Sequence, residues 1–387
     1  MRRKKPSRIF IYRLIFAGII VSIGFIAGIS AYVQSIKEPV RAEVRSLEAA
    51  ISKASLHDTT IEVGSRKFII KKGEIGKWTE PYVRDYTGQK DIRFSDKLDK
   101  YIVNLAAKVD RQATDARFII AGGKPEIISP EQNGQHLDVS EASAILRRSL
   151  LANAGTVTLE PKIVEPDITA DKIHSLGIND FLAAGKSNFS GSSPARIQNI
   201  KISSAKYNGL ILKPGEEFSF NNILGEVEAS GGYAAEKVIK GNKLVYEYGG
   251  GICQVSTTLF RAAIAAGFPI IERRPHAFPV RYYNPQGFDA TIYPGVTDLR
   301  FRNDTAGPVL IQTYISGSDL TFEIYGTGDG RKVAVDGPYQ YDILPDGSMK
   351  AYFTRRVTYA DDSTKDERFN SNYKSPSLYP TEPNPYE

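Results

Sequence analysis

Residues 249–267 read GGGICQVSTTLFRAAIAAG and contain the only cysteine of the 387-residue chain, Cys253. Apolar residues recur at three- and four-residue spacing from Leu259 to Ala266, and Gly267 follows them. This pattern predicts an amphipathic helix that ends at the glycine. Cys253 would lie in the first turn of that helix, where the amide dipoles favour thiolate over thiol. The glycines before it allow a tight turn and a close approach of another molecule.

The net charge of +6 is located at the N-terminus. Six basic residues precede residue 14, and no acidic residue occurs before Glu38. Subtracting these six charges from the net charge (6 − 6) leaves the rest of the chain nearly neutral. The basic balance therefore gives no argument for nucleic-acid binding. The six cations are followed by an uncharged apolar run over residues 14–33. Twenty residues reach about 30 Å as a helix, which is enough to cross a bilayer.

The charge asymmetry predicts a cytoplasmic basic segment at 1–13, a transmembrane helix at 14–33 and a juxtamembrane stalk at 34–57. The bulk of the chain would then be extracytoplasmic in a single-pass cell-membrane protein. The alternative is a cleaved signal peptide, for which Ile29-Ser30-Ala31 offers a small-residue cleavage site. Either way, an exported chain with one cysteine cannot form an intramolecular disulfide, and the thiol is inert, an intermolecular linker or reactive.

Residues 58–168 predict a small α+β module. Two hairpins are expected, at 61–70 around Gly64 and at 118–128 around Gly122-Gly123. Two helices are expected, one capped by Ser95 and one capped by Ser140, and residues 156–159 predict a further strand. No spacing typical of catalysis occurs in this module, which indicates a binding or spacer role.

The region after Cys253 predicts an antiparallel sheet and supplies a candidate base. Strands are expected at 270–272, 277–283, 290–293, 299–302, 309–315 and 320–325. His276 and Asp289 would lie on adjacent strands, and a thiol nucleophile needs such a base and a group that orients it. Papain-like and transglutaminase-like enzymes use the same order of Cys, His and Asp or Asn. The alternative is that Cys253 packs in the core, His276 caps a loop and Asp289 closes a turn.

Several residues around these three are candidates for substrate binding. They are Gly249, Gly250, Gly251, Gln254, Arg273 and Arg274. The arginines could bind a carboxylate bidentately, and an amide at Gln254 could join that of Cys253 around an oxyanion. One cysteine and one nearby histidine make at most half a zinc site, so neither a metal nor a cofactor is expected.

Several motifs together resemble the VanW family. They are KPGEEFSFN at 213–221, GGGICQVSTTL at 249–259, Glu272-Arg273 with His276, GFDAT at 287–291 and DLRFRN at 298–303. The resemblance covers about residues 185–326. The segment before it resembles the peptidoglycan-binding domain that precedes VanW domains, and the β-rich tail at 331–387 is similar to the tails of such proteins. One departure is Phe288, where the family more often has arginine.

The resemblance implies a membrane-anchored cell-wall protein that engages peptidoglycan, in a family associated with vancomycin-resistance gene clusters. Whether it is an enzyme is left open by the residues. If it is, it would be a Cys-His-Asp thiol amidase, peptidase or transpeptidase acting on stem-peptide amide bonds. The alternative is a non-catalytic peptidoglycan-binding or envelope-assembly module that uses the same groove.

Overall fold

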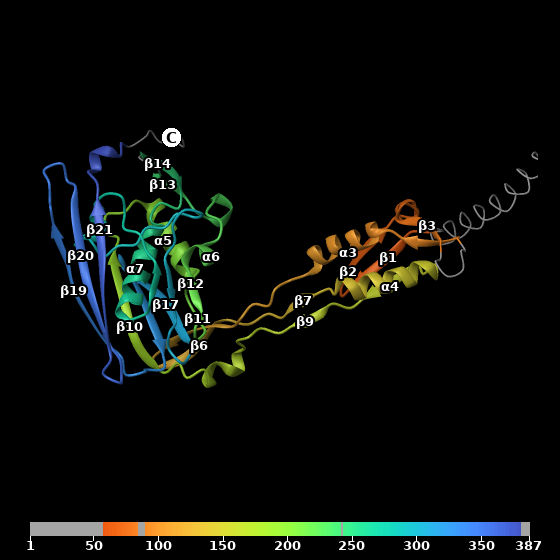
Figure 1. Ribbon diagram of the computed structural model, residues 1–387, viewed down its shortest axis with the longest axis horizontal. Coiled ribbons are helices and arrows are strands. Elements are labelled where there is room, and N and C mark those ends of the chain that lie inside the picture. The colour runs from red at the N-terminus through yellow and green to blue at the C-terminus, as the bar shows by residue number, and fades with distance from the viewer. Residues whose placement is uncertain (1–56, 84–89, 241–242, 381–387) are drawn as a thin grey trace, which may run out of the picture. The chain divides into compact units, whose positions relative to one another are not determined.

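The computed structural model describes residues 57–83, 90–240 and 243–380. They divide into two compact units, which Figure 1 draws in one view. The first unit holds the described residues of 57–113 together with 133–165, and the second holds 114–132 together with the described residues from 166 onward. The predicted basic segment, transmembrane helix and nearly all of the stalk lie outside the described residues. Within the residues that are described, every helix is too short or too polar to serve as a membrane span.

The first unit is a small α+β body, as predicted for this part of the chain. Its main sheet has the strand order β2-β1-β8, with β1 antiparallel to β2 and parallel to β8. Two amphipathic helices, α3 and α4, share one apolar core with this sheet. The elements are β1 (Thr59–Val63), β2 (Arg66–Ile70), α2 (Lys72–Ile75), β3 (Thr79–Val83), β4 (Lys90–Phe94), α3 (Asp96–Val109), β7 (Gly134–His136), α4 (Val139–Leu151), β8 (Thr156–Leu159) and β9 (Lys162–Val164).

The two helix caps predicted in this unit are not made as expected. Ser95 precedes α3, but its side chain accepts no capping hydrogen bond. The cap of α4 is Asp138, whose carboxylate accepts from the amide of Glu141, and Ser140 lies inside the helix. The carboxylate two residues earlier accepts from an orphan amide closer to the N-terminus, so the helix begins sooner than the serine suggested.

The predicted hairpin at 118–128 forms as β5 (Arg117–Ala121) and β6 (Lys124–Ser129). It belongs to the second unit. The amide of Ile120 donates to the Gln312 side chain at 2.7 Å, and Phe118 packs with Leu310 in a small apolar cluster. The hairpin thus extends the core of the second unit, although it is inserted in sequence between parts of the first.

The second unit is built mostly of antiparallel sheets around helix α7 (Ile252–Ala265). The central sheet has the order β10-β18-β17-β11, and smaller sheets have the orders β12-β16-β15 and β13-β14. Their strands are β10 (Asp180–Asn188), β11 (Leu210–Leu212), β12 (Glu217–Ser219), β13 (Ala235–Lys240), β14 (Lys243–Tyr248), β15 (Ile270–Glu272), β16 (Arg300–Arg302), β17 (Val309–Ser316) and β18 (Asp319–Gly326). Two further helices are α5 (Pro194–Ala205), capped by Ser193, and α6 (Phe220–Leu224).

Helix α7 confirms the prediction made from its sequence. Gly251 caps its start at φ +109, and Gly267 follows its end at φ +78. The amide of Gly267 donates to Ile264 and that of Phe268 to Ala263, which is the hydrogen-bond pair of a Schellman end. The helix lies so close to β10 that a Cβ on Gly185 would be 2.2 Å from the carbonyl oxygen of Thr258.

The C-terminal region forms a third layer of the second unit. Strands β19 (Lys332–Tyr341), β20 (Met349–Thr358) and β21 (Thr364–Tyr373) make an antiparallel sheet (Figure 1), and α7 contacts both β10 and β19 of this sheet. The guanidinium of buried Arg355 donates to the carbonyl oxygens of Ile264 and Phe268 at the end of α7, and also to Glu367. The predicted β-rich tail is therefore part of the core.

Two of the strands predicted after the helix are absent. Residues 281–283 form a 3-10 turn, η4 (Arg281–Tyr283), and residues 290–293 make only isolated bridges. Consequently neither His276 nor Asp289 lies in a strand. Hydrogen bonds from loop side chains here take the place of the backbone hydrogen bonds of a sheet. The spacing of apolar residues alone cannot distinguish a strand from such a loop.

Candidate active site

Cys253 is the second residue of α7 and is partly exposed. Its Sγ lies 3.4 Å from Oγ1 of Thr291 and 3.5 Å from the carbonyl oxygen of Ile292. The helix N-terminus adds the positive end of a dipole at the sulfur. The thiol therefore has polar contacts on one side, in a residue that is half-buried.

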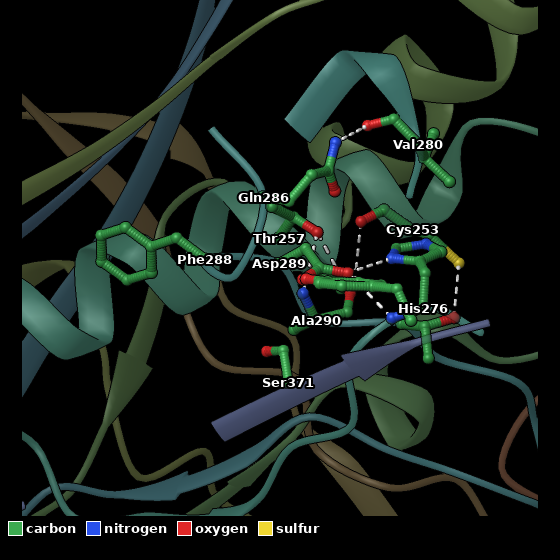
Figure 2. A network of polar contacts seen from close by, with 12 residues as sticks. Cys253, Thr257, His276, Val280, Gln286, Phe288, Asp289, Ala290 and Ser371 are labelled. Carbon is green, nitrogen blue, oxygen red and sulfur yellow. Dashed lines mark hydrogen bonds and ion pairs between the residues drawn. The ribbon is translucent and has the colours of Figure 1, made fainter. Parts of the chain in front are cut away.

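His276 and Asp289 meet beside this thiol (Figure 2). A β-bridge between Arg274 and Thr291 pairs the two loops that carry them. Nδ1 of His276 lies 2.5 Å from a carboxylate oxygen of Asp289, and the same oxygen accepts from the backbone amide of His276 at 2.8 Å. The ring of Tyr283 stacks on the imidazole, with centroids 4.6 Å apart. These contacts fix the imidazole, and Figure 2 shows its other nitrogen turned toward the sulfur.

Asp289 is fully buried, and both of its carboxylate oxygens have partners. One oxygen accepts from His276 as described. The other accepts from the hydroxyl of Tyr373 at 2.5 Å and from the guanidinium of Arg273 at 3.3 Å. A buried carboxylate is costly unless it is paired and hydrogen-bonded, and these contacts meet that requirement.

The ionisation of the three groups is coupled. Burial alone would raise the pKa of the Cys253 thiol, but its side-chain interaction with His276 lowers that pKa overall. Burial alone would lower the pKa of His276, but its interactions with Asp289 and Cys253 raise that pKa to about 9. Burial opposes ionisation of Asp289 as well, yet the hydrogen bond to His276 and the nearby cations hold its pKa well below the usual range. The site thus favours a thiolate–imidazolium pair at neutral pH.

The sequence predicted that Gly249, Gly250 and Gly251 contact a substrate. In the structure, each of them packs closely against other parts of the protein. Gly249 and Gly250 are buried. A Cβ on Gly249 would lie 2.6 Å from Val227, and one on Gly250 would lie 2.7 Å from Cβ of Glu236. Gly251 has φ +109 and packs against Arg196. The glycines are therefore required by close packing around the turn that leads into α7.

Gln254 does not serve as the predicted oxyanion donor or substrate contact. Its side chain is fully buried and donates to the hydroxyl of Ser187 at 3.1 Å, and its backbone amide donates to the carbonyl oxygen of Gly251. The backbone amide and the buried side-chain amide therefore both have partners within the protein. Position 254 instead ties α7 to strand β10.

The two neighbouring arginines differ in role. The guanidinium of Arg273 is 5% exposed and donates to Asp289, Gly287, Asn370 and Ser371, so it cannot bind an external carboxylate as predicted. It holds the buried carboxylate instead. Arg274 is exposed, and its bridge partner Thr291 contacts the sulfur. Directly opposed residues of an antiparallel bridge share a face, so Arg274 remains placed near the thiol.

Sequence reasoning missed Tyr373, Tyr283 and Thr291. Tyr373 is 84 residues from Asp289 and lies on a strand whose local pattern shows only alternation. Tyr283 lies between His276 and Asp289 in the sequence, and Thr291 lies two residues after Asp289. This proximity is the only signal that could have found them. Within the described residues no group of three His, Cys, Asp or Glu side chains could hold a metal ion.

Two family models match this chain. Residues 195–325 match the one described as "VanW like protein", and residues 95–158 match the one described as "Putative peptidoglycan binding domain". Of solved structures, an L,D-transpeptidase of Enterococcus faecium is similar over 31% of this chain and 46% of its own, at 15% identity and a TM-score of 0.21. A likeness this slight carries no argument about fold or activity.

Two curated relatives are similar to about a third of this chain. The uncharacterized protein YoaR of Bacillus subtilis is 37% identical over 139 residues, which is 36% of this chain and 46% of that protein. The vancomycin B-type resistance protein VanW of Enterococcus faecalis is 33% identical over 142 residues, which is 36% of this chain and 47% of that protein. The chain spans about half the length of each. Residues 195–325, which hold Cys253, His276 and Asp289, thus form a VanW-like domain homologous to YoaR and VanW.

Proposed function

We propose that this is a cell-wall protein whose VanW-like domain is a thiol enzyme that acts on amide bonds of peptidoglycan stem peptides. The observation that carries the proposal is the chain of contacts from Asp289 through His276 to Cys253 at the N-terminus of α7. The match of residues 95–158 to a peptidoglycan-binding family model supports the substrate. The pattern of residues 1–33 supports an extracytoplasmic place, with residues 14–33 as the anchor.

The proposed reaction is acyl transfer through a thioester. The thiolate of Cys253 attacks the carbonyl carbon of the amide and forms a C–S bond. His276, as imidazolium, gives its proton to the nitrogen as the C–N bond breaks. Water or a second amine then attacks the thioester while His276 takes its proton, and Cys253 leaves as the thiolate. Asp289 stays ionised throughout and holds the imidazole in place, since its pKa is held so low.

The surroundings of Asp289 support this proposal over a wall-binding module in which the cysteine only packs. A packing role does not require a buried carboxylate with two protein cations and a tyrosine hydroxyl arranged around it. Burying such charges costs desolvation free energy, and buried charge networks next to a nucleophile are frequent at catalytic sites. The orientation of the imidazole toward the thiol therefore favours catalysis.

The test is turnover of purified stem peptides and of isolated peptidoglycan by the full chain. Products and any acyl-enzyme are measured by mass spectrometry, for the wild type beside Cys253→Ser and His276→Gln. We expect a mass adduct on Cys253 and product from the wild type only. Pull-down on isolated peptidoglycan is measured in parallel. Binding that is equal in all three proteins, together with no adduct and no turnover by the wild type, would establish the binding module in place of the enzyme.

A further inference from the structure

Two arginines that no motif indicated lie on elements that contact helix α7. Arg196, in the first turn of α5, packs its stem against Gly251, where a Cβ would lie 3.0 Å from Cγ of the arginine. Gly251 is two residues before Cys253. Arg281 begins η4, the turn that carries Tyr283 on the face of the catalytic imidazole. The two cations thus come from different elements that both border Cys253 and His276.

The aromatic ring of Tyr282 organises the two guanidinium groups. The Cζ of Arg196 lies 3.9 Å from the centroid of this ring, and that of Arg281 lies 5.0 Å from it. Arg196 also donates to the hydroxyl of Ser192 at 2.8 Å, and Arg281 donates to the hydroxyl of Tyr282 at 3.3 Å. Stacking on an aromatic face leaves the edge of a guanidinium free to bind a carboxylate in two hydrogen bonds. The pair is therefore held in place before a ligand binds.

The described part of the chain provides no counter-ion for either guanidinium. Among the residues that the structure describes, no carboxylate forms an ion pair with Arg196 or Arg281. The nearby acid Glu236 instead accepts from the hydroxyl of Ser193 and from the amide of Lys237. Two oriented cations with no counter-ion, beside a thiol and an imidazole, make a site for an anion.

We propose that Arg196 and Arg281 bind a carboxylate of the acyl substrate and so select carboxylate-bearing peptides for attack by Cys253. This inference rests on the proposed thiol chemistry and adds its substrate class. Arg273, which the sequence suggested for this role, is engaged with Asp289. The anion site is instead formed by residues 85 positions apart in the sequence, counting 281 − 196.

The test uses two alkylating reagents that differ in charge. Iodoacetate carries a carboxylate and iodoacetamide is neutral, and both attack the same thiolate, so the ratio of their rate constants cancels changes in the thiol pKa. Cys253 is the only cysteine, so labelling reports this site alone. The double variant Arg196→Gln/Arg281→Gln removes both charges and keeps most of each stem. We expect the ratio of iodoacetate to iodoacetamide rates to fall at least about fivefold.

Arg356→Gln is the matched control, because Arg356 is exposed and paired with Asp366 away from the site. It should leave the ratio unchanged. Arg274→Gln tests whether Arg274, which pairs with Thr291 in the β-bridge, binds the anion instead. An unchanged ratio in the double variant, or a fall only in Arg274→Gln, would overturn the proposal. Protection of Cys253 by N-acetyl-dialanine, but not by its C-terminal amide, and only with both arginines present, would support it further.

The outcomes separate this inference from the proposed function. If the double variant loses the preference for iodoacetate while the wild type turns over no peptide, the anion site stands and the enzymatic proposal fails. If the wild type turns over stem peptides and the ratio does not depend on the arginines, the enzymatic proposal stands and the anion site fails.

Discussion

Replacing Asp289 by asparagine should lower the nucleophilicity of Cys253 at mildly acidic pH. The carboxylate is fully buried and makes the 2.5 Å contact to Nδ1 of His276. An amide has the same shape but no charge, so it stabilises the imidazolium far less. Without imidazolium beside it, the thiol loses the partner that lowers its pKa.

The size of the expected effect on Cys253 can be worked out from the pKa of His276. Its pKa is raised from 6.5 to about 9, a difference that corresponds to about 3 kcal/mol in favour of the charged ring. Burial opposes this change, and the interaction with Asp289 is the largest of those that favour it. Assigning about half of the net effect to the carboxylate gives about 1.5 kcal/mol, or about a tenfold smaller population of the ion pair.

The assay is the second-order rate of iodoacetamide labelling as a function of pH. At pH 6 an ordinary thiol is almost entirely protonated, so labelling there reports the ion pair. We expect Asp289→Asn to react at least about tenfold more slowly than the wild type at pH 6. At pH 10 the two proteins should converge. Asp366→Asn, at an exposed ion pair on β21, is the matched control and should behave as the wild type does.

Asp289→Asn also leaves the guanidinium of Arg273 buried without its counter-ion, which lowers the free energy of unfolding by about 3 kcal/mol or more. Thermal unfolding must therefore show that the variant is folded at the temperature of labelling. A folded Asp289→Asn protein that labels as fast as the wild type at pH 6 would refute the coupling. It would mean that the helix dipole alone sets the thiol pKa.

Four further outcomes are expected. Tyr373→Phe removes one hydrogen bond to Asp289 and should lower the free energy of unfolding by about 2 kcal/mol in denaturant titrations, with a slower labelling rate at pH 6; equal stability would show that this bond contributes nothing. Gly250→Ala should lower the free energy of unfolding by about 2 kcal/mol, because its Cβ has no room, and a neutral effect would contradict the packing. Arg355→Leu should lower the free energy of unfolding by on the order of 3 kcal/mol, and no change would show that the C-terminal sheet does not stabilise the domain. The stabilising effect of His276, measured as the difference in melting temperature from His276→Gln, should be complete below pH 6.5 and disappear as the pH rises through about 9, since its pKa is raised in the folded state; a difference that grows above pH 9 has the wrong sign.

Features that depend on short stretches of chain could be predicted from the sequence. Helix α7 is one, because its apolar spacing, its preceding glycines and its terminal Gly267 all act within a few residues. The hairpins around Gly64 and Gly122 are others. The candidate nucleophile and base also followed from the sequence, because one cysteine and few histidines leave little choice.

Features that depend on which segments meet could be found only in the tertiary structure. Arg273 and Arg274 are adjacent and chemically identical, yet one is buried against Asp289 and the other is exposed. Tyr373 reaches Asp289 only because its sheet packs over α7. Side-chain types and periodicity specify which residues form a helix or strand, but burial and pairing of charges depend on contacts between residues far apart in the chain. The sequence therefore determined the thiol and its helix, and the fold decided which charged groups are buried around them and which are exposed.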